Sequence, residues 1–361
     1  TISLAFASGQ LLWGVTQPVA GACADRFGPG RVMAVGLLAI ALGTALIPFA
    51  ASLPLLVLTI GVLGAGGAGA LGPSVLMGAV ARRIDPARRG MANGIVGAGG
   101  SFGQFAIIPL ASAMLAGLGW TQALWGLALL TLLALPMVLP LRVPAAEAGV
   151  AAAAGGPTMG EAVRGALRDP GFLLLTSGFF VCGFHVAFIA THLPGVVESC
   201  GLPPSVGAWS LAVIGLFNIA GSFWIGWAVG RWRMKSLLSA IYAARAVAVL
   251  AFVLAPKTEA VFLVFAAAIG FTYLSTVPAT AGLVAKLHGA RYMATLFGLV
   301  MFSHQIGGFL GAWLGGRAFE ATGSYDRMWW IDIALAVAAA IVHLPIREAR
   351  VVRSPSAAAP A

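Results

Sequence analysis

The chain has 361 residues, of which 60% are hydrophobic and 9% are charged, and its mean hydropathy is +0.97. A soluble domain would carry about 25% charged residues, so this composition excludes a soluble globular protein and indicates one that crosses a membrane many times. The net charge of +10 does not indicate a nucleic-acid partner. The basic residues stand singly or in small groups at the ends of apolar stretches, where lipid head groups lie.

A helix needs about 20 mainly apolar residues to cross the ~30 Å hydrocarbon core of a membrane. The sequence contains eleven such stretches, most of them separated by short connectors rich in glycine, proline and serine. They predict an all-α, polytopic membrane protein. In chain order the predicted spans are residues 3–24, 31–50, 54–81, 91–117, 121–141, 170–194, 205–230, 236–255, 259–286, 292–317 and 328–346.

The connection between the first two spans carries a motif formed by Gly21, Asp25, Arg26, Gly28 and Arg31. Glycine and proline allow the chain to reverse, and arginine holds the connection in the cytoplasm. The spacing G-x-x-x-D-R-x-G-x-x-R resembles the loop between helices two and three of the major facilitator superfamily of secondary transporters. The resemblance covers the whole chain and implies the major facilitator fold, with two pseudo-symmetric helix bundles.

The orientation follows from lysine and arginine. With the motif loop in the cytoplasm, alternate connections are also cytoplasmic, and together they hold 17 of the 21 basic residues. The opposite side has only Lys257, Arg317 and Arg327. This bias predicts a multi-pass protein of the inner (cytoplasmic) membrane, with a cytoplasmic tail at 350–361.

The longest polar gap divides the chain into two bundles, 1–142 and 170–349, joined by a cytoplasmic linker at 143–169. The Ala/Gly/Pro-rich part of this gap, 143–157, cannot bury enough surface to fold, so we expect a flexible linker there.

The second half repeats the first. The segment Gly226–Lys235 echoes the opening motif 205 residues later, without its acid. The span 170–194 then has no counterpart in the first half, and the chain opens on Thr1 inside an apolar stretch. We therefore expect that the family's first helix is missing and that eleven of twelve helices are visible.

No phosphate-binding loop or HExxH zinc motif occurs in the sequence, so we expect no enzyme, no cofactor and no metal ion. The glycine-rich run Gly64–Gly72 lies inside a span with no preceding strand, which favours close helix packing over dinucleotide binding.

Several spans carry small residues four positions apart, which let helix backbones approach closely. They either pack the helices statically or let the two halves move past one another. These residues are Gly99, Gly103, Ser222, Gly226, Gly230, Gly307, Gly311 and Gly315.

The family resemblance implies a role for the motif aspartate. It places Asp25 against the cytoplasmic start of the penultimate helix, near Arg291. A carboxylate there meets the positive end of the helix dipole, which is worth ~0.3–1 kcal/mol or more if partly buried. Asp25 would then be a latch on the cytoplasmic gate. The alternative is a loop that only forms the hairpin and fixes topology.

Polar side chains inside the membrane are costly and therefore point to the transport path. The alternative for each is a hydrogen bond that only joins helices. A histidine titrates near pH ~6.5, so one of them could carry a coupling proton. The candidates for substrate or proton contact are His185, His192, Asn218, Arg245, Tyr273, His304 and Gln305.

Arg245 lies ten residues after Lys235, ~15 Å into the membrane and so near its midplane. The acid best placed inside a span is Asp332. The resemblance puts both of their helices at the periphery of the second half, which favours a structural Arg245–Asp332 pair over substrate contact.

The segments Gly94–Pro109 and Tyr292–Gly316 resemble the bacterial monocarboxylate permease branch of the superfamily. The resemblance implies a secondary active transporter that moves a small organic anion by alternating access, coupled to a proton or by exchange. Its partners would be that anion, the proton and the lipid bilayer, with no nucleic acid, and we expect a monomer.

Two alternatives remain open at this point. A multidrug or metabolite exporter on the same fold would use a membrane-embedded acid, and Asp332 is the visible one. A non-transporting membrane sensor would usually append a soluble signalling domain, whereas only a short tail follows Arg353.

Overall fold

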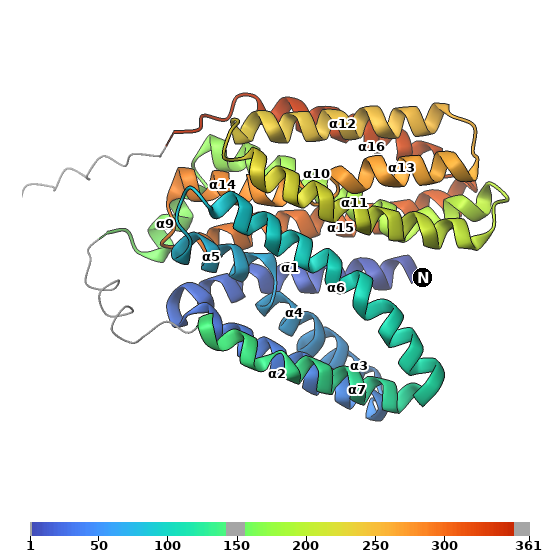
Figure 1. Cartoon of the computed structure of the whole chain (residues 1–361), viewed down its shortest axis with the longest axis horizontal. Helices are drawn as coiled ribbons and strands as arrows, with labels where there is room; N and C mark the ends of the chain where they lie inside the picture. Colours follow the sequence, from blue (N-terminus) through green and yellow to red (C-terminus); the bar gives the residue numbers. More distant parts are fainter. Residues whose placement is uncertain (1, 142–155, 350–361) are drawn as a thin grey trace, which may run out of the picture.

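The computed structural model describes residues 2–141 and 156–349, and all regular secondary structure in these two ranges is helical (Figure 1). Residues 143–155 of the predicted linker and the whole predicted tail, 350–361, therefore lie outside the described residues.

The first bundle contains five helical rods, some of them built from several elements. They are α1 (Ile2–Phe27); α2 (Pro29–Leu46) with the 3-10 turn η1 (Ile47–Phe49); the rod of α3 (Leu53–Leu56), the π-helical η2 (Val57–Ala65), α4 (Gly66–Ala70) and α5 (Pro73–Arg83); α6 (Arg89–Leu118); and α7 (Trp120–Leu133) with η3 (Leu135–Leu141).

The second bundle contains six rods preceded by a short helix. They are α9 (Met159–Ala166), α10 (Pro170–Ser199), α11 (Pro204–Ala228), α12 (Met234–Leu254), the rod of α13 (Glu259–Thr272) and α14 (Thr276–His288), α15 (Met293–Thr322) and α16 (Asp326–His343).

Each of the eleven predicted spans coincides with one rod to within five residues at either end. Among the described residues, eight rods are long and apolar enough to cross a membrane by composition alone. The other three predicted spans are α1, α6 and α16, of which α16 carries Asp326, Arg327 and Asp332. Large apolar side chains such as Val35, Leu133 and Val247 remain exposed on α2, α7 and α12, as expected for lipid-facing surfaces.

The predicted linker contains a helix that the sequence analysis did not predict. Thr158 and Glu161 form a capping box at the start of α9: the backbone N–H of Glu161 donates to Thr158 Oγ1 at 3.3 Å, and the backbone N–H of Thr158 donates to Glu161 Oε2 at 2.7 Å. Ala166, at the other end of α9, is fully buried in the second bundle's core.

Two helix pairs make the most extensive contacts between the halves: α1 packs along α15, and α6 packs along α11. In Figure 1, α2 and α7 lie along one side of the molecule and α12 and α16 along the opposite side. Small-residue helix faces and van der Waals contact, rather than exclusion of water, hold helices together in lipid. The peripheral helices present apolar faces outward.

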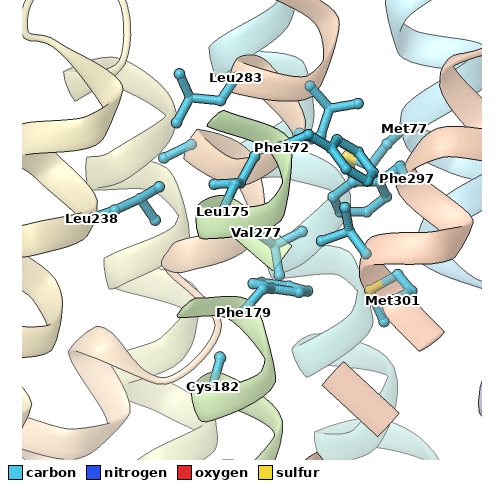
Figure 2. Packing of buried hydrophobic residues seen from close by; sticks show 14 of the residues in the cluster. Met77, Phe172, Leu175, Phe179, Cys182, Leu238, Val277, Leu283, Phe297 and Met301 are labelled. Atoms are coloured by element: carbon cyan, nitrogen blue, oxygen red, sulfur yellow. The ribbon is translucent and has the colours of Figure 1, made fainter. Parts of the chain in front are cut away.

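A buried apolar cluster crosses from one half to the other. Met77 of α5 belongs to the same buried cluster as Phe172 and Phe179 of α10 and Phe297 and Met301 of α15 (Figure 2). The two bundles therefore share a packed core at the end of the molecule that carries Asp25, which we call the Asp25 end.

Two rods are interrupted at corresponding positions. The first breaks at Leu71–Gly72, between α4 and α5, and the second at Tyr273–Ser275, between α13 and α14. Gly72 and Ser275 stand 203 residues apart, close to the 205 residues that separate Gly21 from Gly226. The internal repeat thus extends to the broken helices.

Candidate functional site

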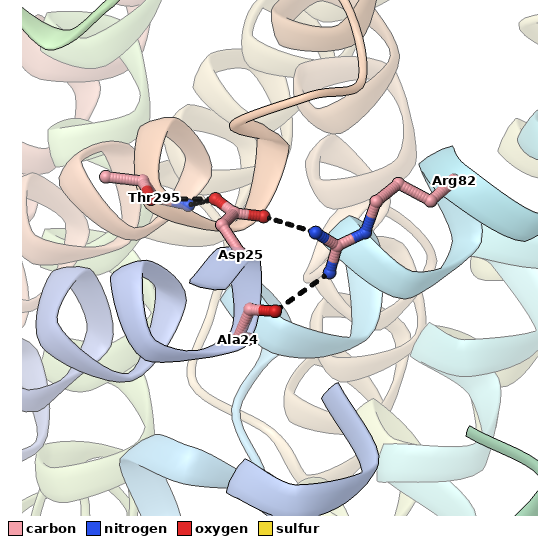
Figure 3. Close-up of polar contacts among 4 residues, drawn as sticks. All are labelled: Ala24, Asp25, Arg82 and Thr295. Atoms are coloured by element: carbon pink, nitrogen blue, oxygen red, sulfur yellow. Dashed lines mark hydrogen bonds and ion pairs between the residues drawn. The ribbon is translucent and has the colours of Figure 1, made fainter. Parts of the chain in front are cut away.

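The carboxylate of Asp25 joins three helices (Figure 3). Arg82 Nη1, at the end of α5, donates to Asp25 Oδ1 at 2.9 Å, and the backbone N–H and Oγ1 of Thr295 each donate to Oδ2 at 2.7 Å. Arg82 Nη2 also donates to the carbonyl of Ala24 at 3.3 Å. The Asp25 side chain is fully buried, so its charge is met by Arg82 and by the first turn of α15.

The glycines around this carboxylate let three backbones meet. A Cβ on Gly21 would lie 2.2 Å from the carbonyl oxygen of Ala294, and one on Gly78 would lie 2.6 Å from the Ala294 Cβ. A Cβ on Gly298 would lie 2.7 Å from the carbonyl oxygen of Gln17. Helices α1, α5 and α15 are therefore in backbone contact at the Asp25 end.

The remaining motif residues serve the turn and its surface. Gly28 has a φ of 89°, a conformation that favours glycine, between α1 and α2. Arg26 and Arg31 are exposed. The Arg291 guanidinium lies over the Tyr292 ring, 5.4 Å from its centroid. Arg82 was not among the predicted residues, although a basic residue ending the third span was a visible signal.

Two of the predicted candidates form hydrogen bonds with the backbone groups that are left free at the break between α13 and α14. Arg245 Nη2 donates to the carbonyls of Thr272 and Tyr273, and Asn218 Oδ1 accepts from the backbone N–H of Leu274 at 2.9 Å. Broken helices are tolerated at membrane depth only where the freed backbone groups find such partners.

Among the described residues, Arg245 and Asp332 do not form a direct ion pair. The Nη2 atom of Arg245 donates to the carbonyls at the break, and its Nη1 atom lies 3.6 Å from Cys182 Sγ. The partner of Asp332 is instead His185: the His185 Nε2 atom lies 3.3 Å from Asp332 Oδ1 and 3.1 Å from the Asp332 carbonyl oxygen. Both side chains are buried between α10 and α16.

Asn218 also connects the two halves. Its Nδ2 donates to Ser101 Oγ on α6, while its Oδ1 holds the α13–α14 break. One amide side chain thus links a helix of the first bundle to the interrupted rod of the second. Ser101 was not among the residues predicted from the sequence.

The other candidates make contacts within the second bundle. Tyr273 donates its hydroxyl to the carbonyl of Val186 at 2.8 Å, and His192 Nε2 lies 2.8 Å from the carbonyl of Ala312. His304 Nδ1 lies 3.1 Å from Gln305 Oε1, its neighbour on α15. For Tyr273 and His192 this geometry is that of interhelical hydrogen bonds.

Helices α1 and α15 carry buried nitrogen donors that have no acceptor among the described residues. They are Trp13 Nε1, Gln17 Nε2 and Gln305 Nε2. Gln17 also adjoins the first break: its Oε1 accepts from Ser74 Oγ at 2.6 Å, and a Cβ on Gly72 would lie 2.3 Å from its Nε2. The sequence signal that was missed is an amide inside an apolar span.

The glycine stripes divide into three cases. Gly226 meets Gly90 and Gly94 of α6, so it lies between the halves. Gly307 and Gly311 pack against the backbone of α10, inside the second bundle, so they do not form a surface along which the halves move. A Cβ on Gly99 or Gly103 would meet no described atom within 4 Å.

Two helical bundles with an internal repeat, broken rods at matching positions and buried polar groups between them define a polytopic membrane transporter. A family model described as the Major Facilitator Superfamily matches residues 1–312, and the chain belongs to that superfamily. It is a transporter and not an enzyme. Within the described residues, no group of three or more His, Cys, Asp or Glu side chains is placed to hold a metal ion.

Relatives and solved structures agree with this family. The chain is 29% identical over 338 residues to monocarboxylate transporter 13 of Bos taurus, covering 91% of this chain and 76% of the relative. It is 22% identical to the MFS-type transporter YcxA of Bacillus subtilis, covering 95% and 85%. It superimposes on FucP in the outward conformation with a TM-score of 0.72 at 16% identity (95% and 89% covered) and on the human organic anion transporter MFSD10 with 0.70 at 18% (94% and 83%).

Proposed function

We propose that this protein moves a small organic anion of the monocarboxylate class across the inner membrane by alternating access, coupled to a proton or by exchange. The similarity to monocarboxylate transporters supports the substrate class. The excess of basic residues at the Asp25 end supports placing that end in the cytoplasm.

The observation that carries this proposal is the pair of broken helices. In secondary transporters, interrupted helices at matching positions of two repeats frame the substrate site near the midplane. Here the first break adjoins Gln17, and the second is held by Asn218 and Arg245. The unpartnered donors of Trp13, Gln17 and Gln305 offer N–H groups of the kind a carboxylate accepts.

In this proposal Asp25 latches the cytoplasmic gate. Its contacts with Arg82 and Thr295 fasten α15 of the second half to α1 and α5 of the first. Opening toward the cytoplasm separates these helices, so the bonds of Asp25 break as the gate opens. The alternating states then differ by contacts at this end, as a two-state mechanism requires.

His185, paired with Asp332, is our proposed carrier of the coupling proton, and His304 is the second candidate. A histidine and a carboxylate at 3.3 Å can share a proton, and both are sheltered from lipid inside the second bundle. This position does not favour the exporter alternative, because Asp332 lies between α10 and α16 rather than at the contact between the halves.

The proposal is tested by uptake into proteoliposomes containing the purified protein. Labelled lactate and pyruvate are compared with uncharged glycerol, with and without an inwardly directed proton gradient. We expect saturable uptake of the acids, stimulated by the gradient or by unlabelled acid inside the vesicles. Equal permeation of glycerol, or no uptake of either acid under any gradient, would contradict the substrate class.

A further inference from the structure

A cavity of about 910 Å³ lies at the Asp25 end, away from the broken helices' polar contacts. It is lined by residues of α5 and α6 from the first half and of α11 and α14 from the second. Gly90 and Gly226, which both line it, are in backbone contact: a Cβ on Gly226 would lie 2.9 Å from the carbonyl oxygen of Gly90. An occupant of the cavity therefore touches both bundles beside a point where their backbones are in contact.

The charged residues that line the cavity are all basic, namely Arg89, Arg231 and Lys286. Lys286 is already paired, since its Nζ lies 3.0 Å from Glu348 Oε2. Arg89 uses Nε to donate to the carbonyl of Ile84 at 2.9 Å, and its terminal nitrogens have no acceptor among the described residues. The Arg231 guanidinium stacks over the Trp227 ring, 4.0 Å from its centroid, and has no carboxylate partner among the described residues.

Two arginines from opposite halves thus face one cavity without a compensating acid in its lining. Like charges gathered against low-dielectric walls raise the local concentration of anions. Guanidinium groups also match carboxylate and phosphate oxygens in a bidentate manner. Electrostatics at this cavity therefore select an anion over a cation or a neutral molecule.

The rest of the lining fits an apolar body with one polar contact. Four methionines line the cavity, which adapt to varied apolar shapes: Met77, Met91, Met234 and Met293. Asn93, 4% exposed, also lines it, and its Oδ1 is buried without a hydrogen-bond partner. A carboxamide with no fixed partner is free to rotate and to present its NH₂ group to an anion.

We propose that this cavity is an anion-binding site for an organic anion with a carboxylate or phosphate head and an apolar body, held by Arg89 and Arg231. Two sources offer this chemistry: a soluble carboxylate and an anionic phospholipid. The inference goes beyond the proposed function, because binding at this cavity does not require transport. By bridging the halves beside Gly90 and Gly226, the bound anion stabilises the conformation in which the Asp25 end is closed.

The test measures protection of one lining residue in the purified chain. Ala285, on α14, is replaced by cysteine, and its reaction with a maleimide is followed at that residue by mass spectrometry. The probes are benzoate, with benzamide as its uncharged counterpart, and phosphatidylglycerol in nanodiscs, with phosphatidylcholine as the zwitterionic counterpart. We expect at least one anionic probe to slow the reaction several-fold more than its counterpart.

Variants then assign the site. The change Arg89→Gln with Arg231→Gln should raise the half-protecting concentration about tenfold or more, because charge-assisted contacts are lost. The matched control is Arg88→Gln with Arg233→Gln, which removes two exposed arginines outside the lining and should leave protection unchanged.

Each outcome decides the question. Protection by benzoate alone assigns a soluble carboxylate, and protection by phosphatidylglycerol alone assigns a lipid head group. Equal protection by the uncharged or zwitterionic probes, no protection by any probe, or an equal loss in both pairs of variants would overturn the inference. If uptake of monocarboxylates persists in that case, the proposed function stands and only the anion site falls.

Discussion

Asp25 shows how one side chain can hold a conformation. Its carboxylate accepts three hydrogen bonds from Arg82 and Thr295 while being fully buried, and Gly21 brings α1 close enough to α15 for this contact. Hydrogen bonds to a charged group contribute about 1.5–3 kcal/mol each, against about 0.5–1.5 for neutral pairs. The charge, and not only the shape, of this residue therefore matters.

Replacing Asp25 by asparagine should weaken the closed Asp25 end while preserving insertion and expression. The amide keeps the volume but loses the charge that Arg82 and the α15 dipole stabilise, so the population shifts toward states open at that end. We expect uptake to slow about tenfold or more, an effect of at least ~1.4 kcal/mol. Uptake at the original rate in proteoliposomes would reduce the motif to a hairpin and topology signal.

Arg245 should act through the backbone of the break. Arg245→Met leaves the carbonyls of Thr272 and Tyr273 without their donor, at a cost of about 1–3 kcal/mol for each unsatisfied group. We expect a lower melting temperature and a lower folded yield, both measured by fluorescence-detected size exclusion. In the control variant Arg233→Met, neither quantity should change. Adding Asp332→Ala to Arg245→Met should not recover the melting temperature or the folded yield. A partial recovery in this double variant would instead support the Arg245–Asp332 pair predicted from the sequence.

His185 and His192 lie on one helix but have different partners, Asp332 and the Ala312 carbonyl. If His185 carries the coupling proton, His185→Gln should flatten the pH dependence of uptake, because glutamine cannot gain or lose a proton. His192→Gln is the matched change and should retain the pH profile. Identical profiles in the two variants would remove His185 from the coupling site.

At the scale of elements, the bundles meet where side chains are absent. Helices α1 and α15 approach at Gly21 and Gly298, and α6 and α11 approach at Gly94 and Gly226. In lipid such small-residue contacts hold helices by close packing. A side chain added at one of these contacts pushes two whole helices apart, because the obstructing atoms belong to backbone.

Gly21→Ala tests this packing. The added Cβ would lie 2.2 Å from the Ala294 carbonyl oxygen, and an overpacked contact of this kind typically costs about 1–3 kcal/mol. We expect a lower melting temperature and slower uptake. Gly9→Ala on the same helix is the control, since a Cβ there would meet no described atom within 4 Å. Equal melting temperatures for the two variants would show that the α1–α15 contact yields freely.

At the scale of the whole molecule, the orientation in the membrane is the broadest prediction. In a chain lacking Cys23 and Cys200, single cysteines at Ser52 and Ala260 should react with an impermeant thiol reagent added to whole cells, and one at Ala87 should not. The reason is that Ala87 lies in the arginine-rich turn between α5 and α6, which the positive-inside rule retains in the cytoplasm. External labelling at Ala87 would invert the topology and with it the side on which the latch acts.

The sequence by itself determined the helical spans, the repeat and the gate motif, because apolar length, glycine and proline turns and basic connectors are local properties of the chain. Only the tertiary structure decided which polar groups meet. Asp25 and Arg82 stand 57 residues apart, Arg245 and Thr272 stand 27 apart, and His185 and Asp332 stand 147 apart. A buried arginine predicts a partner but not which one: here the carbonyls freed by the break before Ser275 compete for Arg245, and Asp332 is left to His185. Such choices depend on how the helices cross, and that is set by packing between distant segments.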